Sequence, residues 1–274
     1  MSDHGRMHTP ESGLATPAAA HSDDPPHPHF NRRVTSFRAR RSTISDAQQA
    51  TWDRLWPELG RQVRDGDAPA GRLDTTPAGR LDTTPAGQLD TEAWFGRHAP
   101  VVLEIGCGTG TSTLAMAQAE PDIDVVAVEV YRRGLAQLLS AMDREGVTNI
   151  RLIRGDGVDV LTHMFGPDSL TGVRVFFPDP WPKARHHKRR LLQPDTVALI
   201  ADRLRPGGIL HAATDHMGYA GHIAEVGDAE PRLRRVDPGD AGLPISTDRP
   251  VTKYQRKALA GTEVAELLWE KTTP

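Results

Sequence analysis

The chain has 274 residues, of which 38% are hydrophobic, and its formal net charge is -3 at pH 7. This length allows one large domain with appended segments, and the overall charge excludes a protein that is basic throughout, so any nucleic-acid surface must be local. A single cysteine, Cys107, excludes internal disulfides and multi-cysteine metal sites and favours a reducing cytoplasm. No run approaches about eighteen apolar residues and the amino terminus does not resemble a secretory signal, so we expect no membrane partner.

The first 95 residues predict appended segments. Residues 1–30 are rich in Pro, His, Ser and Asp and predict a disordered tail. Residues 31–60 are interpreted as a basic arm with five arginines, followed by a helix that begins at the capping-box pattern of Ser45 and Gln48. Residues 61–95 contain the repeat AGRLDTTP, AGRLDTTP, AGQLDTEA and predict a linker or surface insertion.

From residue 96 onward, strand and helix patterns alternate. Strand patterns cover residues 101–105, 124–130, 149–156, 172–180 and 208–215, with helical patterns between them. This alternation predicts a doubly wound, parallel α/β sheet with helices on both faces over residues 96–274. Residues 263–271 are interpreted as a late strand, antiparallel at the edge. Because ligands bind outside the carboxyl ends of such strands, polar residues at the strand ends are the candidate site.

The first strand pattern runs into EIGCGTG, residues 104–110, whose glycines permit a tight turn and close approach of a ligand. Its GxGxG spacing after an acid suits a nucleoside better than a pyrophosphate. Glu129 ends the second strand and can accept both hydroxyls of a ribose, or can be a solvated acid. Asp156 follows the third strand and can accept from an adenine amino group, or can cap the next helix, and the two roles are compatible.

The fourth strand pattern leads into FFPDPWPKARHHKRR, residues 176–190. Prolines on both sides of Asp179 restrict the backbone, so this carboxylate is presented rigidly. The basic run over residues 183–190 can be a solvated face, but its position beside Trp181 favours a contact with phosphates. Adjacent histidines suit a single metal ion poorly, so we expect no metal here.

Together these motifs resemble those of bacterial tRNA (guanine-N7)-methyltransferases. The glycine loop is generic to class I S-adenosylmethionine enzymes, whereas PDPWPKARHHKRR is highly specific. The resemblance covers residues 34–60 and 95–272, and it departs at Cys107, at the repeat, and at Gln255, where an acid is expected. It rests on EIGCGTG (104–110), Glu129, Gly155-Asp156, FPDPWPK (177–183), RHHKRR (185–190), ATD (213–215), VTKYQ (251–255) and SFRARR (36–41).

The resemblance implies a Rossmann-like, doubly wound, seven-stranded α/β methyltransferase fold with a disordered basic amino-terminal extension. It implies methyl transfer from S-adenosylmethionine to N7 of a guanine in the tRNA variable loop, at position 46, by a monomer or homodimer. Asp179 is the implied catalytic residue. The implied cofactor-binding residues are Glu104, Gly106, Gly108, Glu129, Asp156 and Asp179. The implied substrate-binding residues are Lys183, Asp215, Thr252, Lys253, Tyr254 and Gln255, and the implied RNA-binding residues are Arg185, His186, His187, Lys188, Arg189 and Arg190.

Guanine N7 has an in-plane lone pair and needs no general base, so we expect catalysis by positioning and electrostatics. Asp179 or Asp215 can accept from the N1–H and N2–H₂ edge of guanine, and Asp179 can instead hold the amino group of the cofactor. The alternatives are a methyltransferase for another RNA or a small molecule, and a non-catalytic RNA-binding protein. A dehydrogenase is disfavoured because Thr111 stands where a dinucleotide fingerprint needs glycine.

Overall fold

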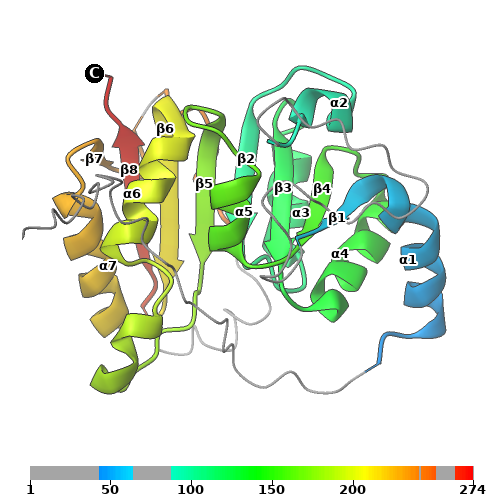
Figure 1. Ribbon diagram of the computed structural model, residues 1–274, viewed down its shortest axis with the longest axis horizontal. Coiled ribbons are helices and arrows are strands. Elements are labelled where there is room, and N and C mark those ends of the chain that lie inside the picture. The colour runs from blue at the N-terminus through cyan, green and yellow to red at the C-terminus, as the bar shows by residue number, and fades with distance from the viewer. Residues whose placement is uncertain (1–42, 64–87, 241, 251–262, 274) are drawn as a thin grey trace, which may run out of the picture. The chain divides into compact units, whose positions relative to one another are not determined.

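Eight strands form one mixed sheet in the order β1-β4-β3-β2-β5-β6-β8-β7 in the computed structural model (Figure 1). The structure describes residues 43–63, 88–240, 242–250 and 263–273. Strands β1 to β6 run parallel to one another, and β8 is antiparallel to both β6 and β7. The strands are β1 (Gly60–Gln62), β2 (Val101–Ile105), β3 (Asp124–Glu129), β4 (Ile150–Arg154), β5 (Leu170–Phe176), β6 (Leu204–Thr214), β7 (Leu233–Val236) and β8 (Ala265–Lys271).

The helices follow the strands as the alternation predicts. Those expected from the sequence are α1 (Asp46–Leu59), α3 (Thr111–Ala119), α4 (Arg132–Glu145), α5 (Gly157–His163) and α6 (Pro194–Arg203). The structure adds α2 (Thr91–Phe95), the 3-10 helix η1 (Ala184–Arg189) and α7 (Met217–Ala229). Helix α7 itself contains three glycines, Gly218, Gly221 and Gly227, which are poor helix formers and obscure its helical periodicity in the sequence.

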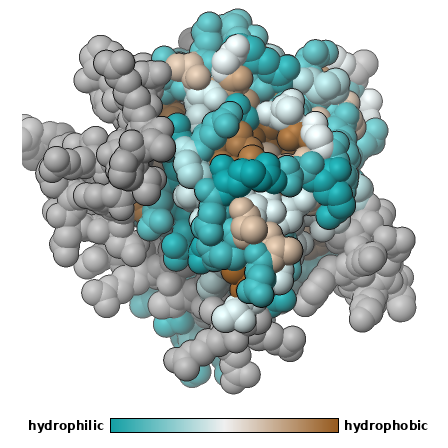
Figure 2. Space-filling model, turned by 90° about the vertical axis from the view of Figure 1, so that its right-hand side faces the viewer, coloured by the Kyte–Doolittle hydropathy of each residue, from teal (hydrophilic) through white to brown (hydrophobic). Residues whose placement is uncertain are grey.

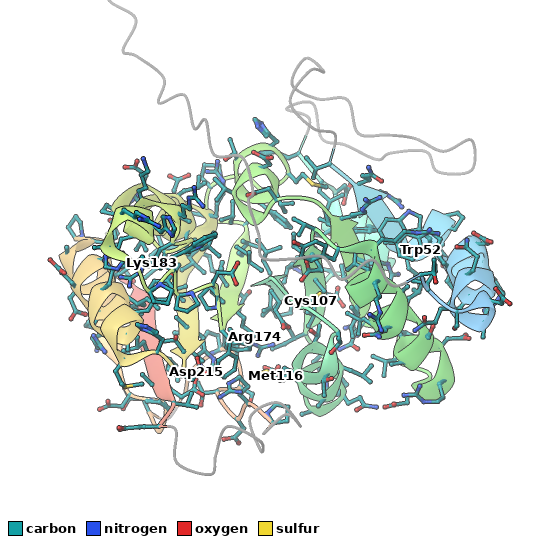
Figure 3. All side chains as sticks on the ribbon, turned by 90° about the horizontal axis from the view of Figure 1, so that it is seen from below. Trp52, Cys107, Met116, Arg174, Lys183 and Asp215 are labelled. Atoms are coloured by element: carbon teal, nitrogen blue, oxygen red, sulfur yellow. The ribbon has the colours of Figure 1, made fainter. Side chains whose placement is uncertain are left out.

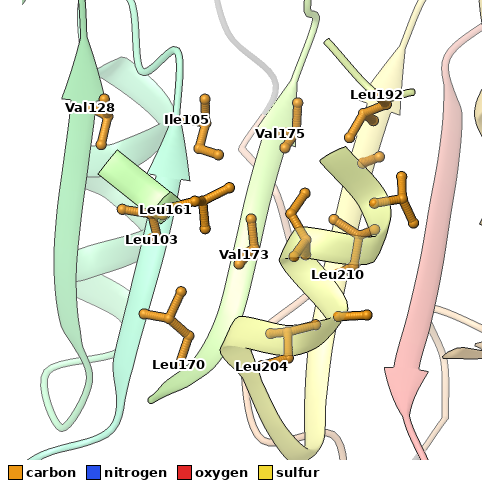
Figure 4. Close-up of a cluster of buried hydrophobic side chains, with 14 of the residues drawn as sticks. Leu103, Ile105, Val128, Leu161, Leu170, Val173, Val175, Leu192, Leu204 and Leu210 are labelled. Atoms are coloured by element: carbon orange, nitrogen blue, oxygen red, sulfur yellow. The ribbon is translucent and has the colours of Figure 1, made fainter. Parts of the chain in front are cut away.

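Strand β2 shows why the sheet is covered on both faces. Successive side chains of a strand point to opposite faces, so neighbouring apolar residues enter different layers. Val102 packs with side chains of α1, α3 and α4. Leu103 and Ile105 pack with α5, α6 and α7 in the larger cluster, part of which is drawn in Figure 4. The predicted doubly wound α/β arrangement is therefore confirmed.

The sheet has eight strands rather than the seven implied by the resemblance. Strand β1 is too short for any alternation to be visible, and it joins the edge by backbone pairing of Gly60 with Leu152. Strand β7 is also short, and only its two end residues, Leu233 and Val236, are buried. The predicted late strand, β8, is antiparallel as expected, but it lies inside the sheet between β6 and β7. The prediction of an edge position for β8 was wrong, because β7 was not visible in the sequence.

Helix α1 packs against α4 and the β1 end of the sheet. Its capping box is confirmed: the Ser45 hydroxyl accepts from Gln48 N at 3.3 Å, and the Gln48 side chain accepts from Ser45 N at 3.1 Å. Trp52 is buried against α4, where the Arg132 guanidinium lies 4.7 Å from its ring centre. The surface on the α1 side is largely hydrophilic, with a few apolar groups exposed between polar ones (Figure 2).

The predicted divisions of the first 95 residues lie partly outside the described structure. The structure does not describe residues 1–42 and 64–87. These ranges include the predicted tail, most of the basic arm and most of the repeat. Both ends of the predicted linker 61–95 are structured, since β1 extends to Gln62 and α2 begins at Thr91.

The chain reverses its direction of travel across the sheet between β2 and β5. From β2 it proceeds to β3 and β4 on one side, and then returns to β5 and β6 on the other. In open α/β sheets this switch point, at the carboxyl ends of the strands, is where ligands bind. The EIGCGTG loop follows β2 and the PDPW turn follows β5, so both predicted motifs meet here.

Candidate cofactor and substrate site

The loop after β2 is tight because three glycines adopt left-handed backbone angles. The φ values of Gly106, Gly108 and Gly110 are 79°, 58° and 73°, which residues with a Cβ rarely adopt. The amides of Gly106 and Cys107 both donate to the Val128 carbonyl, at 2.8 and 3.1 Å, and so tie the loop to β3.

One side of this glycine loop is packed and the other is open. A Cβ at Gly134 in α4 would lie 2.1 Å from the Gly108 carbonyl oxygen, so only glycine there lets the helix approach. A Cβ built on Gly106 or Gly108 meets no atom of the described residues within 4 Å. The side of these two residues on which a Cβ would stand is therefore open, which leaves room for a ligand beside the backbone.

Glu129 ends β3 beside this loop. Its Oε2 accepts from Gly108 N at 3.0 Å, and its Oε1 accepts from the amides of Val130 and Tyr131 at 2.7 and 3.0 Å. Burial raises the pKa of Glu129 and the nearby charge of Asp179 acts in the same direction, whereas the three backbone hydrogen bonds lower it. The structure thus brings Glu129, the glycine loop and Asp179 together.

Asp156 caps helix α5, which is one of the two roles considered from the sequence. Its Oδ1 accepts from Val158 N at 2.7 Å, and its side chain is half-buried at the carboxyl end of β4. The capping bond uses one oxygen and is compatible with a second contact to a ligand.

Glu104 lies inside β2, with 3% of its surface exposed. Burial raises the pKa of Glu104 to about 7, although the Arg174 guanidinium on β5 pulls it downward. Within the described part of the chain, its Oε2 has no hydrogen-bond partner. A buried carboxylate oxygen without a partner is rare and calls for a bound group or water.

The turn after β5 presents Asp179 at the surface between two strained residues. Phe177 and Trp181 have φ values of 51° and 44°, in the left-handed region that bulky residues avoid. Trp181 is buried, whereas Asp179 is exposed and makes no hydrogen bond or ion pair with any residue that the structure describes. Backbone strain of this kind clusters at functional sites, and here it brackets the predicted catalytic residue.

The basic run forms helix η1, which packs on Trp181. The rings of Trp181 and His186 meet edge to face with centres 5.7 Å apart, and the Arg189 guanidinium lies 5.0 Å from the Trp181 ring. Desolvation and the surrounding cations Arg189, Arg185, Lys183 and Lys188 lower the pKa of His186, which disfavours the charged form of its ring. The side chains of Arg185, Lys188 and Arg189 are exposed.

Arg190 differs from the rest of the basic run, because it is buried with 3% of its surface exposed. Its Nε donates to the Pro180 carbonyl at 2.9 Å, and its guanidinium lies 4.8 Å from the centre of the Tyr219 ring. The structure therefore does not bring Arg190 to the surface with the cations that precede it.

The remaining predicted substrate residues fall into two groups. Lys183 and Asp215 are exposed and follow β5 and β6, on the same edge as Asp179. Figure 3 looks onto this edge and shows them with Arg174 between them and the glycine loop at Cys107. The predicted residues of the VTKYQ motif, Thr252, Lys253, Tyr254 and Gln255, lie outside the described residues.

Sequence reasoning missed a buried ionic layer beneath the site. Arg174 is fully buried and donates to Glu120 at 2.7 Å. Arg249 donates to Glu266 at 2.6 Å, and its guanidinium lies 4.8 Å from the centre of the Phe177 ring. The arginine within the apolar run of β5 could have indicated this layer, because a charged side chain is rarely buried without a partner. No local sequence pattern distinguishes Arg249 or Glu266, because the two residues come into contact only in the folded protein.

Comparison with known proteins identifies the family. A family model described as "Putative methyltransferase", Methyltransf_4, matches residues 98–266, more than half of the chain. A protein of Mycolicibacterium vanbaalenii named tRNA (guanine-N(7)-)-methyltransferase is 96% identical over 100% of both chains. One of Mycolicibacterium gilvum with the same name is 76% identical over 99% of this chain and 100% of its own. The chain belongs to the tRNA (guanine-N7)-methyltransferase family.

The solved structures that resemble this chain share much less of its sequence than the relatives above. The 16S rRNA methyltransferase KamB has a TM-score of 0.45 and 17% identity, covering 74% of this chain and 98% of its own. An rRNA methylase of Streptococcus thermophilus has a TM-score of 0.43 and 16% identity, covering 64% of this chain and 88% of its own.

None of the helices in the described ranges is long and apolar enough to cross a bilayer. Nor do three or more His, Cys, Asp or Glu side chains in these ranges gather in a way that could hold a metal ion.

Proposed function

We propose that this protein is a cytoplasmic tRNA (guanine-N7)-methyltransferase that transfers a methyl group from S-adenosylmethionine to a guanine of the tRNA variable loop. The observation that carries the proposal is the exposed Asp179 on its strained turn. It stands across the switch point from the glycine loop, close enough to Glu129 for its charge to raise the pKa of that carboxyl. Membership of the family supports the reaction, and the site geometry supports the assignment of roles.

The residues at the switch point fit S-adenosylmethionine. The open side of Gly106 and Gly108 would admit a ligand against the backbone. Oε2 of Glu104, which has no hydrogen-bond partner among the described residues, would suit an ammonium group such as that of methionine. Glu129 would accept from the ribose hydroxyls and Asp156 from the adenine amino group. Both carboxylates make backbone hydrogen bonds already, but a carboxylate offers about four acceptor positions, so these roles remain open to them.

Bound S-adenosylmethionine would supply an electrophilic methyl group on a sulfonium sulfur. The protein then has to orient the guanine so that the N7 lone pair faces that methyl group, and no general base is required. Asp179, presented at the surface, would accept from the guanine N1–H and N2–H₂ edge, or from the amino group of the cofactor. Burial and the carboxylates of Glu104 and Glu129 raise the pKa of the Cys107 thiol, so it stays protonated and is unsuited to nucleophilic attack.

Exposed cations beside Asp179 would bind the RNA backbone. Lys183, Arg185, Lys188 and Arg189 lie within or next to η1, which begins directly after the PDPWPK segment. Cations of this kind neutralise phosphates without reading the base sequence, so they would orient the tRNA while Asp179 addresses the guanine. We also propose that Asp215 and the VTKYQ motif contact the substrate, and that His186 and His187 contact the RNA.

The test is nucleoside mass analysis of unmodified tRNA after incubation with the protein and S-adenosylmethionine. We expect N7-methylguanosine in the variable loop. Asp179→Ala should reduce kcat by at least about 100-fold, since it removes a positioned charged acceptor from the reacting base. Asp122→Ala, which changes an exposed aspartate at the opposite edge of the sheet, should retain activity.

Three results would count against the proposal. A methyl group at another position or on another RNA would reassign the substrate. Absence of S-adenosylmethionine binding in calorimetry would favour a non-catalytic RNA-binding protein. Full activity in Asp179→Ala would remove the catalytic role of that residue.

A further inference from the structure

The Asp179 turn needs support from the surrounding structure. Phe177 and Trp181 both have left-handed backbone angles, and such strain persists only where neighbours impose it. Pro178 and Pro180 have no amide hydrogen to contribute. The turn is tied to β6 by the hydrogen bond from Phe177 N to the Ala213 carbonyl, at 2.8 Å.

On its carboxyl side, the turn is held by Arg190. The Nε of this arginine donates to the Pro180 carbonyl at 2.9 Å, directly after Asp179 in the chain. Its guanidinium also lies over the Tyr219 ring of α7, which is fully buried and accepts from Leu192 N through its hydroxyl at 3.1 Å. Arg190 therefore connects the turn to α7.

On its amino side, the turn is held by Arg249. The guanidinium lies 4.8 Å from the centre of the Phe177 ring and 5.5 Å from that of Phe176. Both Nε and Nη2 donate to Oε1 of Glu266 on β8, at 3.1 and 2.6 Å, and Glu266 Oε2 also meets His211 Nε2 at 2.8 Å. Although burial raises the pKa of Glu266, the hydrogen bonds from His211 and Arg249 lower it overall, so Glu266 is a fixed anion facing Arg249.

We propose that Arg190 and Arg249 are positioning residues, which hold the Asp179 turn from its two sides, and that neither one contacts RNA. The side chain of Arg249 is 4% exposed and Arg190 is 3% exposed, so their charges are turned into the protein. Reaching a phosphate would require each arginine to leave a hydrogen-bonded, buried position. This inference rests on the proposed function, because it assigns the two residues to that reaction.

A positioning role and a phosphate-binding role affect different quantities, which can be measured independently. A residue that positions Asp179 affects the rate of methyl transfer, since misplacement by about 1 Å lowers a rate by up to about 100-fold. A residue that contacts a phosphate affects the salt dependence of binding, because each lost contact reduces the log–log slope by about one unit.

The experiment compares Arg190→Met and Arg249→Met with Arg185→Met, which changes an exposed arginine in η1. For each protein, kcat and KM for tRNA are measured, together with tRNA affinity over a range of salt concentrations and the thermal unfolding midpoint. We expect Arg190→Met and Arg249→Met to lower kcat by about 10- to 100-fold with an unchanged salt slope. Arg185→Met should reduce the slope by about one unit and raise KM for tRNA.

Arg190→Lys and Arg249→Lys carry the test if the methionine variants fail to fold. Lysine keeps the charge but cannot both stack on a ring and make the arginine's hydrogen bonds, so a positioning role predicts reduced kcat in the lysine variants as well. A reduced salt slope with normal kcat in the methionine variants would overturn the proposal, as would folded variants with normal kcat. If the wild-type protein forms no N7-methylguanosine, it is the proposed function that fails.

Discussion

At the scale of single residues, the most unusual feature is a row of ionisable side chains across the middle of the sheet. Glu104 on β2 is the register partner of Arg174 on β5, which is in turn the partner of His211 on β6. Partners on adjacent strands point to the same face, so the three side chains share one buried layer. Their exposed fractions are 3%, 0% and 0%.

The ionisation of Glu104 should be visible in stability. Its folded pKa of about 7 lies above its ordinary value of 4.5, so the folded protein binds an extra proton between these pH values. The stability contributed by the protonated acid is fully present below about pH 4.5 and is lost as the pH rises through about 7, with an upper magnitude of about 3 kcal/mol.

Glu104→Gln should therefore flatten the pH dependence of the unfolding free energy between about pH 5 and pH 8. Urea unfolding of both proteins across this range measures the effect, and the difference between them isolates Glu104 from the other carboxylates. The same pH dependence in both proteins would show that the pKa of Glu104 is not raised.

At the scale of elements, the segment 242–250 packs on the same face of the sheet as α1, α3 and α4. Ile245 packs against β2 and β5, where a Cβ on Gly172 would lie 2.8 Å from it. Ser246 is held at both backbone groups: its amide donates to Glu120 at 2.6 Å, and its carbonyl accepts from Arg174 at 3.1 Å. The Arg174–Glu120 pair thus joins α3, β5 and this segment.

Two ion pairs of similar length should differ strongly in their effect on stability. The Arg174–Glu120 pair, at 2.7 Å, has exposed side-chain fractions of 0% and 7%, whereas Arg54–Asp143 between α1 and α4, at 2.6 Å, has 56% and 38%. Arg174→Met should lower the free energy of unfolding by about 3–5 kcal/mol, since it leaves the buried carboxylate of Glu120 without its cation. Arg54→Met should cost less than about 1 kcal/mol.

Urea unfolding measures both changes, and the double variant Arg174→Met/Glu120→Leu provides the control. Removing both charges should restore much of the stability lost in Arg174→Met, because the unpaired carboxylate is gone. Equal losses for the buried and the exposed pair would contradict this account.

At the scale of the whole molecule, charge is distributed unevenly around an acidic total of -3. Exposed cations are gathered at η1, on the carboxyl edge of the sheet beside Asp179. A net negative protein repels a polyanion except where such a local field attracts it, so binding should be orientated towards this edge.

Exchanging Arg185 and Lys188 for glutamine should weaken tRNA binding and reduce its log–log salt slope by up to about two units. The matched control exchanges Arg144 and Arg205, which are exposed at the opposite edge, where α4 ends and β6 begins. Both double variants change the net charge equally. A filter-binding or fluorescence titration at several salt concentrations measures the slopes, and equal slopes in the two variants would contradict binding at η1.

Features that depend on neighbouring residues could be read from the sequence. The apolar runs of β2 to β6 predicted the parallel sheet, and Ser45 with Gln48 predicted the start of α1. The glycine spacing predicted a tight loop, because left-handed backbone angles are a property of the residue itself. Glu129 and Asp179 were recognisable as candidates from their positions at strand ends.

The tertiary structure decided everything that depends on residues far apart in the chain. It buried Arg190 while leaving Arg185 exposed, although both stand in one basic run. It paired Arg249 with Glu266 beneath Phe177 and placed β7 outside β8. The physical reason is that burial and ion pairing depend on which elements pack together, whereas local sequence determines only which elements can form.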